Sequence, residues 1–289
     1  MAKRNGGLGM IRLGPNEQPM IEAFLTEHLD TSMFPLSNLQ EYGMNGGHTR
    51  AMAFWRDTNV GPITDLLGIT DEGMVMPHLR SILDKDIMAT LNGRTVIGII
   101  GEQTSCRRAQ RALGLTDSDL HLDKDETLFA MNLSNLSSVN TDLSIRSFIE
   151  FPRDVLVGWM HDYLTETLGT PGDDAFPMAV QRFDDFAGKG SHVVLVDADT
   201  PVAMTGFNAQ VGQTVQIGGV YTPPELRRRG YARTAIELHL AQAKKSGAKR
   251  ALLFADDPAA IKAYRSVGFL DIGQFTLCIF SKPMGISNV

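Results

Sequence analysis

The sequence predicts a mixed α+β (mixed α/β) protein made of two domains, and three observations favour this class. The chain has 289 residues, a length that favours two domains of roughly 140 residues each. Short apolar runs typical of buried strands alternate with segments whose apolar residues recur at helical spacing. A strand-helix pattern from the first half also recurs in the second half. Residues 134–142, rich in Ser and Asn, read as a linker, so we expect domains at 1–138 and 139–289.

Composition narrows the class of protein further. Hydrophobic residues make up 43% and charged residues 21% of the chain, as in soluble globular proteins. The net charge of −6 argues against non-specific binding of nucleic acid. The two cysteines, Cys106 and Cys278, are too few for a disulfide framework or a zinc site. Without a secretory signal or an apolar run of membrane-spanning length, we expect a cytoplasmic protein with no metal and no membrane partner.

In the first half, apolar periodicity predicts helices between short strands. The predicted helices are 16–29, 32–43, 78–91 and 105–113. The predicted strands are 49–56, 63–68, 74–76, 96–100 and 127–133. Asn92-Gly93 is a stop signal between the third helix and the strand that follows it.

The second half repeats this alternation with longer helices. The predicted helices are 153–168, 173–186 with a break considered at Pro177, a long helix between Gly230 and Gly247, and 258–267. The predicted strands are 143–148, a hairpin of 193–196 with 201–208, then 215–221, 251–254 and a strand pair over 269–281.

The internal repeat is clearest when residues 96–115 are placed over 250–269. Strand then falls on strand, helix on helix, and Gly114 on Gly268, while Gln110 falls on Tyr264. The arginine-rich turn of the second half has no counterpart in the first, where 73–78 occupies the corresponding place. If the two halves are copies, only the second has kept this turn.

That turn joins the strand 215–221 to the long helix and has the composition of an anion site. Three arginines, Arg227, Arg228 and Arg229, are followed by Gly230, which allows close approach to the backbone. Free N–H groups and the positive end of the helix dipole favour a phosphate there. The alternative is a solvated basic cap that also includes Arg233. The turn is neither a P-loop nor a dinucleotide fingerprint, since it lacks the Gly-Lys-Ser/Thr and two of the three glycines.

With these residues in place, the sequence resembles the GCN5-related N-acetyltransferase (GNAT) family. The run 227–232, Arg-Arg-Arg-Gly-Tyr-Ala, is similar to the family's Gln/Arg-x-x-Gly-x-Gly/Ala motif. Residues 257–269 resemble its second signature, Asn-x-x-Ala-x-x-x-Tyr-x-x-x-Gly-Phe, in the expected order. The resemblance covers about 140–282. It implies two tandem acetyltransferase-fold domains with a degenerate N-terminal copy, each a mixed, mostly antiparallel sheet flanked by helices.

The resemblance implies that acetyl-CoA binds where the fourth strand of this fold separates from the fifth. Backbone groups of Val220 and Thr222 would bind the pantetheine and polarise the thioester, and the turn would hold the pyrophosphate. The implied cofactor-binding residues are Val220, Thr222, Arg227, Arg228, Arg229, Gly230, Tyr231, Ala232, Arg233 and Asp257. Two positions depart from the family pattern. Arg228 stands where many members have glycine, and Asp257 where the family usually has Asn; a plain N-cap is the alternative for Asp257.

Tyr264 stands where the family places the proton donor to the departing thiolate, and a phenol keeps its proton at neutral pH. The alternative is a tyrosine that only packs its helix. The resemblance implies direct attack of a primary amine, because neither cysteine lies in the motifs. A base for the amine is not identifiable. Gln216 and Asn208 are polar residues on strands that would line the acceptor cleft, but neither is a base; Glu225 lies in the turn, and His192 comes just before a strand.

The sequence therefore predicts an acetyl-CoA-dependent N-acetyltransferase that acts on a primary amine of a small molecule or peptide, as a monomer or homodimer. One rival is a non-catalytic acyl-CoA-binding sensor, in which Asp257 marks a decayed site. A third reading is a nucleotide-binding enzyme that uses the arginine turn for phosphate. No segment carries a signature of the acceptor.

Overall fold

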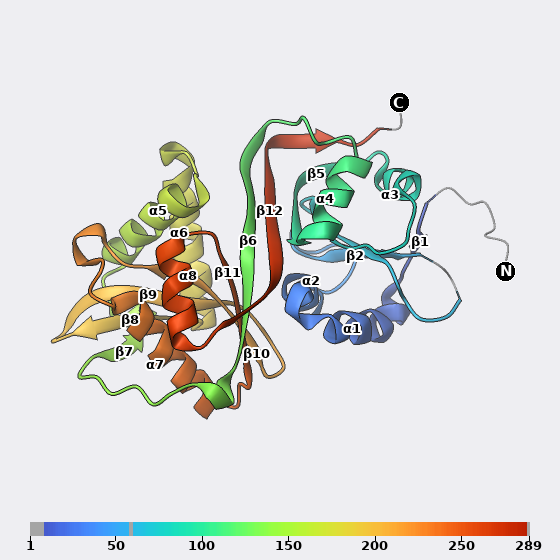
Figure 1. Ribbon diagram of the computed structural model, residues 1–289. Helices are drawn as coiled ribbons and strands as arrows, with labels where there is room; N and C mark the ends of the chain where they lie inside the picture. Colours follow the sequence, from blue (N-terminus) through green and yellow to red (C-terminus); the bar gives the residue numbers. More distant parts are fainter. Residues whose placement is uncertain (1–8, 58–59, 288–289) are drawn as a thin grey trace. The chain divides into compact units, whose positions relative to one another are not determined.

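The chain forms two compact units in the computed structural model, which describes residues 9–57 and 60–287 (Figure 1). Unit 1 comprises the residues up to Glu126 together with those from Gly273 onwards, and unit 2 is Thr127–Ile272. This division differs from the expected domains 1–138 and 139–289 at both ends. The N-terminal part of unit 1 ends at Glu126, before the expected boundary at 138. The segment from Gly273 onwards belongs to unit 1 because its strand pairs with a strand of that unit.

Unit 1 is a mixed sheet with the strand order β1-β2-β3-β4-β5-β12. Among the strands of unit 1 that the structure describes, β4 and β5 form the one parallel pair. The strands are β1 (Ile11–Arg12), β2 (Met52–Arg56), β3 (Leu66–Thr70), β4 (Met74–His78), β5 (Thr95–Glu102) and most of β12 (Leu270–Gly285). The helices are α1 (Gln18–Glu27), α2 (Leu29–Tyr42), α3 (Asp84–Leu91) and α4 (Gln103–Ala112).

Unit 2 has the same kind of sheet, with the strand order β6-β11-β10-β9-β8-β7 and one parallel pair, β10 with β11. The strands are the second part of β6 (Leu120–Asn132), β7 (Ser144–Ser147), β8 (His192–Asp197), β9 (Thr200–Val211), β10 (Thr214–Tyr221) and β11 (Arg250–Ala255). The helices are α5 (Arg153–Leu168), α6 (Gly172–Lys189), α7 (Tyr231–Lys245) and α8 (Pro258–Val267). The predicted mixed, mostly antiparallel sheets flanked by helices are confirmed.

The two halves of the sequence exchange their last strands. Thr127–Asn132 of β6 pairs with β11 of unit 2, whereas β12 pairs with β5 of unit 1. The strand pair predicted over 269–281 is wrong, because this segment is one continuous strand, β12. The strand-helix repeat is confirmed, since β5 and α4 correspond to β11 and α8.

The predicted helix 78–91 is shorter than expected, because it begins only at Asp84. His78 ends β4, and residues 79–83 form a loop. The backbone N–H groups of three loop residues donate to a buried carboxylate and not to helical carbonyls. In unit 2, by contrast, α6 continues through Pro177 without the break that was considered.

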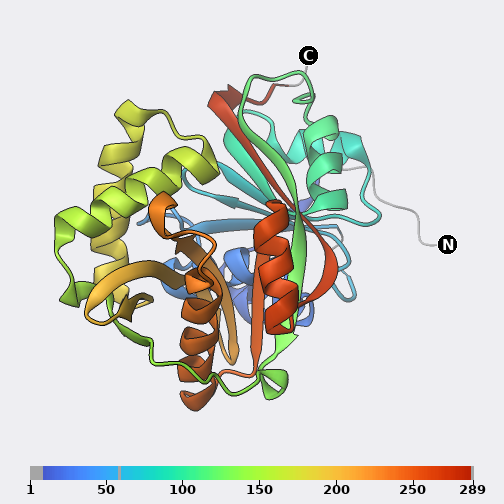
Figure 2. The same ribbon diagram turned by 60° about the vertical axis from the view of Figure 1, so that its left-hand side comes forward.

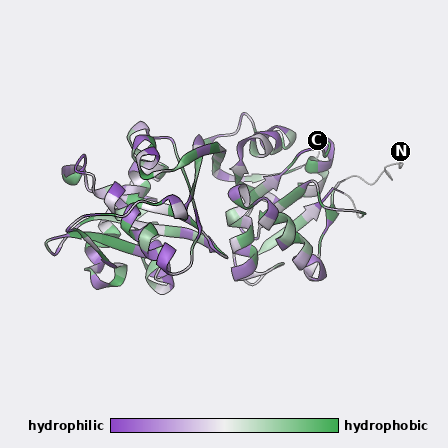
Figure 3. Cartoon of the chain, turned by 60° about the horizontal axis from the view of Figure 1, so that its bottom comes forward, coloured by the Kyte–Doolittle hydropathy of each residue, from purple (hydrophilic) through white to green (hydrophobic). Residues whose placement is uncertain are grey.

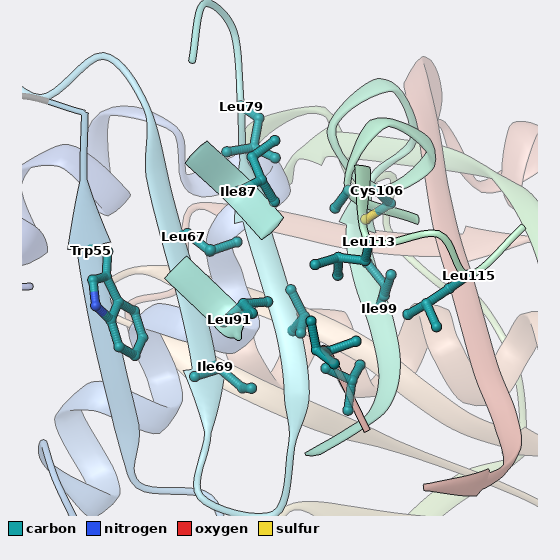
Figure 4. Packing of buried hydrophobic residues seen from close by; sticks show 14 of the residues in the cluster. Trp55, Leu67, Ile69, Leu79, Ile87, Leu91, Ile99, Cys106, Leu113 and Leu115 are labelled. Carbon is teal, nitrogen blue, oxygen red and sulfur yellow. The ribbon is translucent and has the colours of Figure 1, made fainter. Parts of the chain in front are cut away.

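Each unit has its own hydrophobic core. In unit 1, residues of β2, β3 and β5 pack against α3 and α4, as Figure 4 shows for Trp55, Ile87 and Cys106. In unit 2, Val194 packs with α5 and α6, whereas its neighbour Leu195 packs with α7. Adjacent strand residues point to opposite faces of a sheet. Helices α5 and α6 therefore cover one face of the sheet, and α7 covers the other (Figure 2). Figure 3 shows hydrophobic residues along the strands and mixed stretches on the helices.

Candidate functional site

The candidate site lies in unit 2, where β10 parts from its parallel neighbour β11. Pairing between the two strands covers Thr214–Gln216 only, although β10 continues to Tyr221. Its pairing with β9 is also irregular between Gly218 and Tyr221, and Gly219 has a φ of 61°. This left-handed conformation favours glycine and marks a bulge. Beyond Gln216, the edge of β10 that faces β11 therefore has no strand partner.

Buried polar atoms accompany this stretch of β10. Both amide atoms of Gln216 are buried without a hydrogen-bond partner among the described residues, as are Thr222 Oγ1 and His192 Nε2. His192 is 1% exposed and stacks on Phe186, with ring centroids 3.5 Å apart. Its Nε2 would lie 2.8 Å from a Cβ added to Gly219, so the ring faces the bulge. Buried polar groups are rarely left unsatisfied, which indicates that water or a polar ligand binds here.

Burial lowers the pKa of His192 well below its ordinary value, and the charges of His239 and Arg182 act in the same direction. The imidazole is therefore neutral at physiological pH, with one nitrogen able to accept a hydrogen bond. Its other ring nitrogen, Nδ1, is 2.9 Å from the hydroxyl oxygen of Ser191.

The loop between β10 and α7 presents backbone N–H groups. Gly230 is the N-cap of α7 with a φ of 83° and supplies no side-chain cap. The backbone N–H groups of five successive residues donate no hydrogen bond within the described part of the chain: Arg228, Arg229, Gly230, Tyr231 and Ala232. Since the first N–H groups of a helix have no intrahelical partner and the dipole is positive at this end, the loop is suited to bind an anion.

Arg228 adopts the left-handed conformation that the family's glycine would allow, with a φ of 65°. It is exposed and takes part in no recorded ion pair of the described chain. A side chain in this conformation costs on the order of 1 kcal/mol, so the sequence departure is tolerated with some strain. The guanidinium of Arg228 is thereby left available to an anionic ligand.

The other arginines of the turn have partners in the protein. Arg227 forms an ion pair of 2.5 Å with Glu166 of α5, and its Nε donates to the carbonyl of Thr222 at 2.9 Å. Arg233 pairs with Glu237 on the surface of α7 at 3.1 Å. Each of these two arginines is thus already paired with a carboxylate, and their contribution of positive charge to the ligand stays a prediction. Arg227 also ties the loop to α5.

The side chain of Tyr231 contributes to the fold at the start of α7. Its hydroxyl donates to Asp197 at 2.7 Å. Only the backbone N–H of Tyr231 is therefore free for a ligand, as it is for Ala232. Tyr221, the last residue of β10, similarly donates its hydroxyl to Asp162 of α5 at 3.1 Å. Burial raises the pKa of Tyr221, and so does the neighbouring Asp162.

Asp257 has a local structural role. It is the N-cap of α8, and its carboxylate accepts a hydrogen bond from the N–H of Ala260 at 2.7 Å. The alternative of a plain N-cap is confirmed, and contact with the cofactor stays a prediction.

We expect Asp257→Ala to lower the free energy of unfolding by about 1 kcal/mol, because the helix loses its N-cap. Asp257→Asn keeps a capping oxygen and serves as the control, with a loss of only a few tenths of a kcal/mol. Urea unfolding of both variants measures these values. A loss of the same size in both variants would contradict the capping role.

Tyr264 lies on α8 and is 9% exposed. Its ring packs between Phe129 and Phe269, with centroids 6.2 Å from each. The predicted ring packing is therefore present, and the role of the hydroxyl as proton donor stays a prediction.

Several residues that shape the site were not predicted from the sequence. These include Glu166 and Asp162, which bind the loop arginine and the tyrosine at the end of β10. The Gly218-Gly219 pair inside a predicted strand was a usable signal for the bulge, because glycine in a strand interior often marks one.

In residues 9–57 and 60–287, no group of three or more His, Cys, Asp or Glu side chains is placed to hold a metal ion. Across the same residues, no helix has both the length and the apolar content needed to cross a bilayer.

Comparison with known proteins identifies the fold. A tandem GNAT protein from the clavulanic acid biosynthesis pathway is similar over 98% of this chain and 100% of its own, with a TM-score of 0.55 and 13% identity. A GCN5-related N-acetyltransferase from Sphaerobacter thermophilus covers 96% of each chain, with a TM-score of 0.57 and 13% identity. An acetyltransferase from Colwellia psychrerythraea covers 90% of this chain and 97% of its own (TM-score 0.51, 12% identity). The chain therefore has the tandem acetyltransferase fold.

The family match lies in the second unit. Residues 156–269 match the model of the acetyltransferase (GNAT) family. This part of the chain contains β10, the arginine loop and α8. No curated protein matches the sequence. The match supports acetyl transfer from an acyl-CoA as the general class of activity.

Proposed function

We propose that unit 2 is an acetyl-CoA-dependent N-acetyltransferase that acetylates a primary amine of a small molecule or peptide. The observation that carries this proposal is the set of free N–H groups from Arg228 to Ala232, at the end of a strand that leaves its parallel neighbour. A diphosphate bound to the loop would direct the rest of an extended ligand along the unpaired edge of β10. The buried unpaired hydroxyl of Thr222 fits a ligand with amide groups such as pantetheine.

Acetyl-CoA supplies an activated acetyl group as a thioester. The residues of this chain then have three tasks. The loop amides and Arg228 bind the diphosphate, and the N–H of Val220 donates to the thioester carbonyl oxygen and stabilises the charge that develops there. Tyr264 holds a proton for the departing sulfur. The amine attacks the carbonyl carbon directly, the carbon–sulfur bond breaks, and the departing sulfur takes the proton of Tyr264. The proton released by the amine returns to the phenolate through solvent.

The amine must reach the carbonyl in its neutral form. His192 offers a neutral imidazole whose Nε2 faces the bulge of β10, and Gln216 offers both amide atoms. These are the side chains that we propose to bind polar groups near the acceptor. A small molecule or peptide is favoured as acceptor over nucleic acid because the chain carries a net charge of −6. The chain is proposed to act as a monomer or homodimer in the cytoplasm.

The rival function, a non-catalytic acyl-CoA sensor, rested on the departure from Asn at position 257. The carboxylate of Asp257 caps α8, and asparagine would cap this helix equally well. The departure is therefore neutral between the two functions, which acceptor-dependent release of thiol separates.

The test of the proposal is release of CoA thiol from acetyl-CoA with polyamines, aminoglycosides and amino acids as acceptors. We expect at least one class of amine to raise the release rate above that without acceptor, and mass spectrometry to show the acetylated product. The variant Gly230→Glu serves as the negative control. CoA binding without acceptor-dependent thiol release from any amine would favour the sensor.

A further inference from the structure

Unit 1 contains a counterpart of the loop in unit 2. There, β4 is followed by the loop 79–83, α3 and the parallel strand β5, just as β10 is followed by its loop, α7 and β11. The parallel pairing of β4 with β5 is also short, covering Met74 with Gly98 and Val75 with Ile99. The earlier expectation that 73–78 replaces the turn is wrong, since these residues lead into and form β4.

In this counterpart the backbone N–H groups are already occupied. Asp65 is 0% exposed, and its Oδ1 accepts from the N–H groups of Arg80 at 2.6 Å, Ser81 at 2.8 Å and Ile82 at 3.1 Å. Its Oδ2 accepts from the Ser81 hydroxyl at 2.7 Å. Three successive N–H groups thus converge on one carboxylate oxygen, as they would on an oxygen of a phosphate.

The carboxylate is held in its charged form. Burial would raise the pKa of Asp65, but the hydrogen bonds from the Ser81 hydroxyl and from the N–H groups of Ile82, Ser81 and Arg80 bring it below its ordinary value. A buried carboxylate with this many donors behaves as a resident anion.

Sheet register shows why unit 2 lacks such an anion. Leu66 pairs with His78 at the end of β4, and Met204 pairs with Tyr221 at the end of β10. Asp65 comes directly before Leu66 in unit 1, and Ala203 comes directly before Met204 in unit 2. Asp65 and Ala203 therefore occupy equivalent positions in the two sheets. Alanine has no carboxylate, so the loop of unit 2 keeps its N–H groups free.

Where β4 leaves β5, the described residues enclose a cavity of about 10 Å³, lined by residues that include Phe34, Pro35, Pro77, Gly101 and Phe275. This volume holds about one water molecule, which is far too little for a pantetheine arm.

We propose that Asp65 is a built-in anion that occupies the phosphate-binding loop of unit 1, so that this chain binds a single CoA, through unit 2. The part concerning CoA rests on the proposed function, whereas the occupancy of the loop by Asp65 does not. Unit 1 then keeps the fold but has no free loop for a phosphate, because the carboxylate of Asp65 accepts hydrogen bonds from the N–H groups that a phosphate would otherwise bind.

The first experiment measures the stoichiometry of CoA binding by isothermal titration calorimetry. We expect one CoA per wild-type chain and none for Gly230→Glu, because that change blocks only the loop of unit 2. Two CoA per chain, or one that persists in folded Gly230→Glu, would overturn the closure of unit 1.

The second experiment tests the loop of unit 1 without CoA, by thermal unfolding in the Gly230→Glu background with inorganic phosphate or with chloride at equal ionic strength. Asp65→Ala is expected to unfold at a lower temperature and to regain roughly 3 °C or more in phosphate. The matched control Asp71→Ala removes an exposed carboxylate in the turn after β3 and is expected to show no such gain. Equal responses of the two variants to phosphate would overturn the proposal.

Asp65→Asn covers the case in which the alanine variant does not fold. This variant keeps one acceptor oxygen for the loop but removes the charge. The midpoint of its thermal unfolding should therefore lie several degrees below that of the Gly230→Glu protein with Asp65 intact. A midpoint equal to that of the parent would contradict the role of the carboxylate. Because these measurements do not involve CoA, their result is independent of whether unit 2 is an acetyltransferase.

Discussion

Replacing Gly230 with glutamate is expected to weaken CoA binding roughly 100-fold or more, since losing even one or two charge-assisted hydrogen bonds has this effect. A Cβ at Gly230 meets no protein atom within 4 Å, so the new side chain fits without a clash with the protein. Its carboxylate would place a negative charge beside the N–H groups of Arg228 to Ala232. Isothermal titration with CoA measures the change.

The control for this prediction is Gly247→Glu. Gly247 lies just after the other end of α7, has a φ of 101°, and likewise has no atom within 4 Å of an added Cβ. Both variants put a glutamate into a left-handed conformation, so both share the cost in stability of about 1 kcal/mol. Only Gly230→Glu should lose affinity. Equal affinity for CoA in the two variants would refute the placement of the site.

Tyr264→Phe is expected to lower kcat by roughly 100-fold or more, with little change in CoA affinity, if the hydroxyl supplies the proton to the departing sulfur. Phenylalanine keeps the ring contacts with Phe129 and Phe269, so the core of unit 2 should be preserved. Steady-state thiol release, together with a CoA titration of the same preparation, separates turnover from binding.

The matched control is Tyr42→Phe, which removes a phenol in unit 1 whose ring stacks on His48 at 3.9 Å. This variant should keep the wild-type kcat. If Tyr264→Phe also kept it, the residue would only pack its helix, and another group would have to protonate the thiolate.

The candidate loop was predictable because its signal is local. Three arginines, one glycine and an apolar helical stretch are consecutive in the sequence, and the structure shows the expected strand, turn and helix in that order. The left-handed conformation of Arg228 follows from the family pattern, which has glycine at that position. The N-cap alternative for Asp257 also needed only neighbouring residues, because a cap bonds within its own helix.

Features that depend on distant residues were not predictable in this way. Glu166 pairs with Arg227 across 61 positions of the chain, and Asp65 reaches the loop of unit 1 from 15 positions before Arg80. Nothing in the local pattern of either segment specifies these partners. The exchange of β6 and β12 was missed for the same reason, because a strand's own residues do not reveal which sheet it joins.

The claim that supports the rest is that the N–H groups of the loop before α7 bind the diphosphate of CoA. The most direct test follows the backbone amide resonances of Arg228 to Ala232 by NMR while CoA or pantetheine is added. We predict large shifts of these resonances with CoA and small ones with pantetheine, which lacks the diphosphate. Shifts that are absent with CoA, or equal for both ligands, would contradict the account.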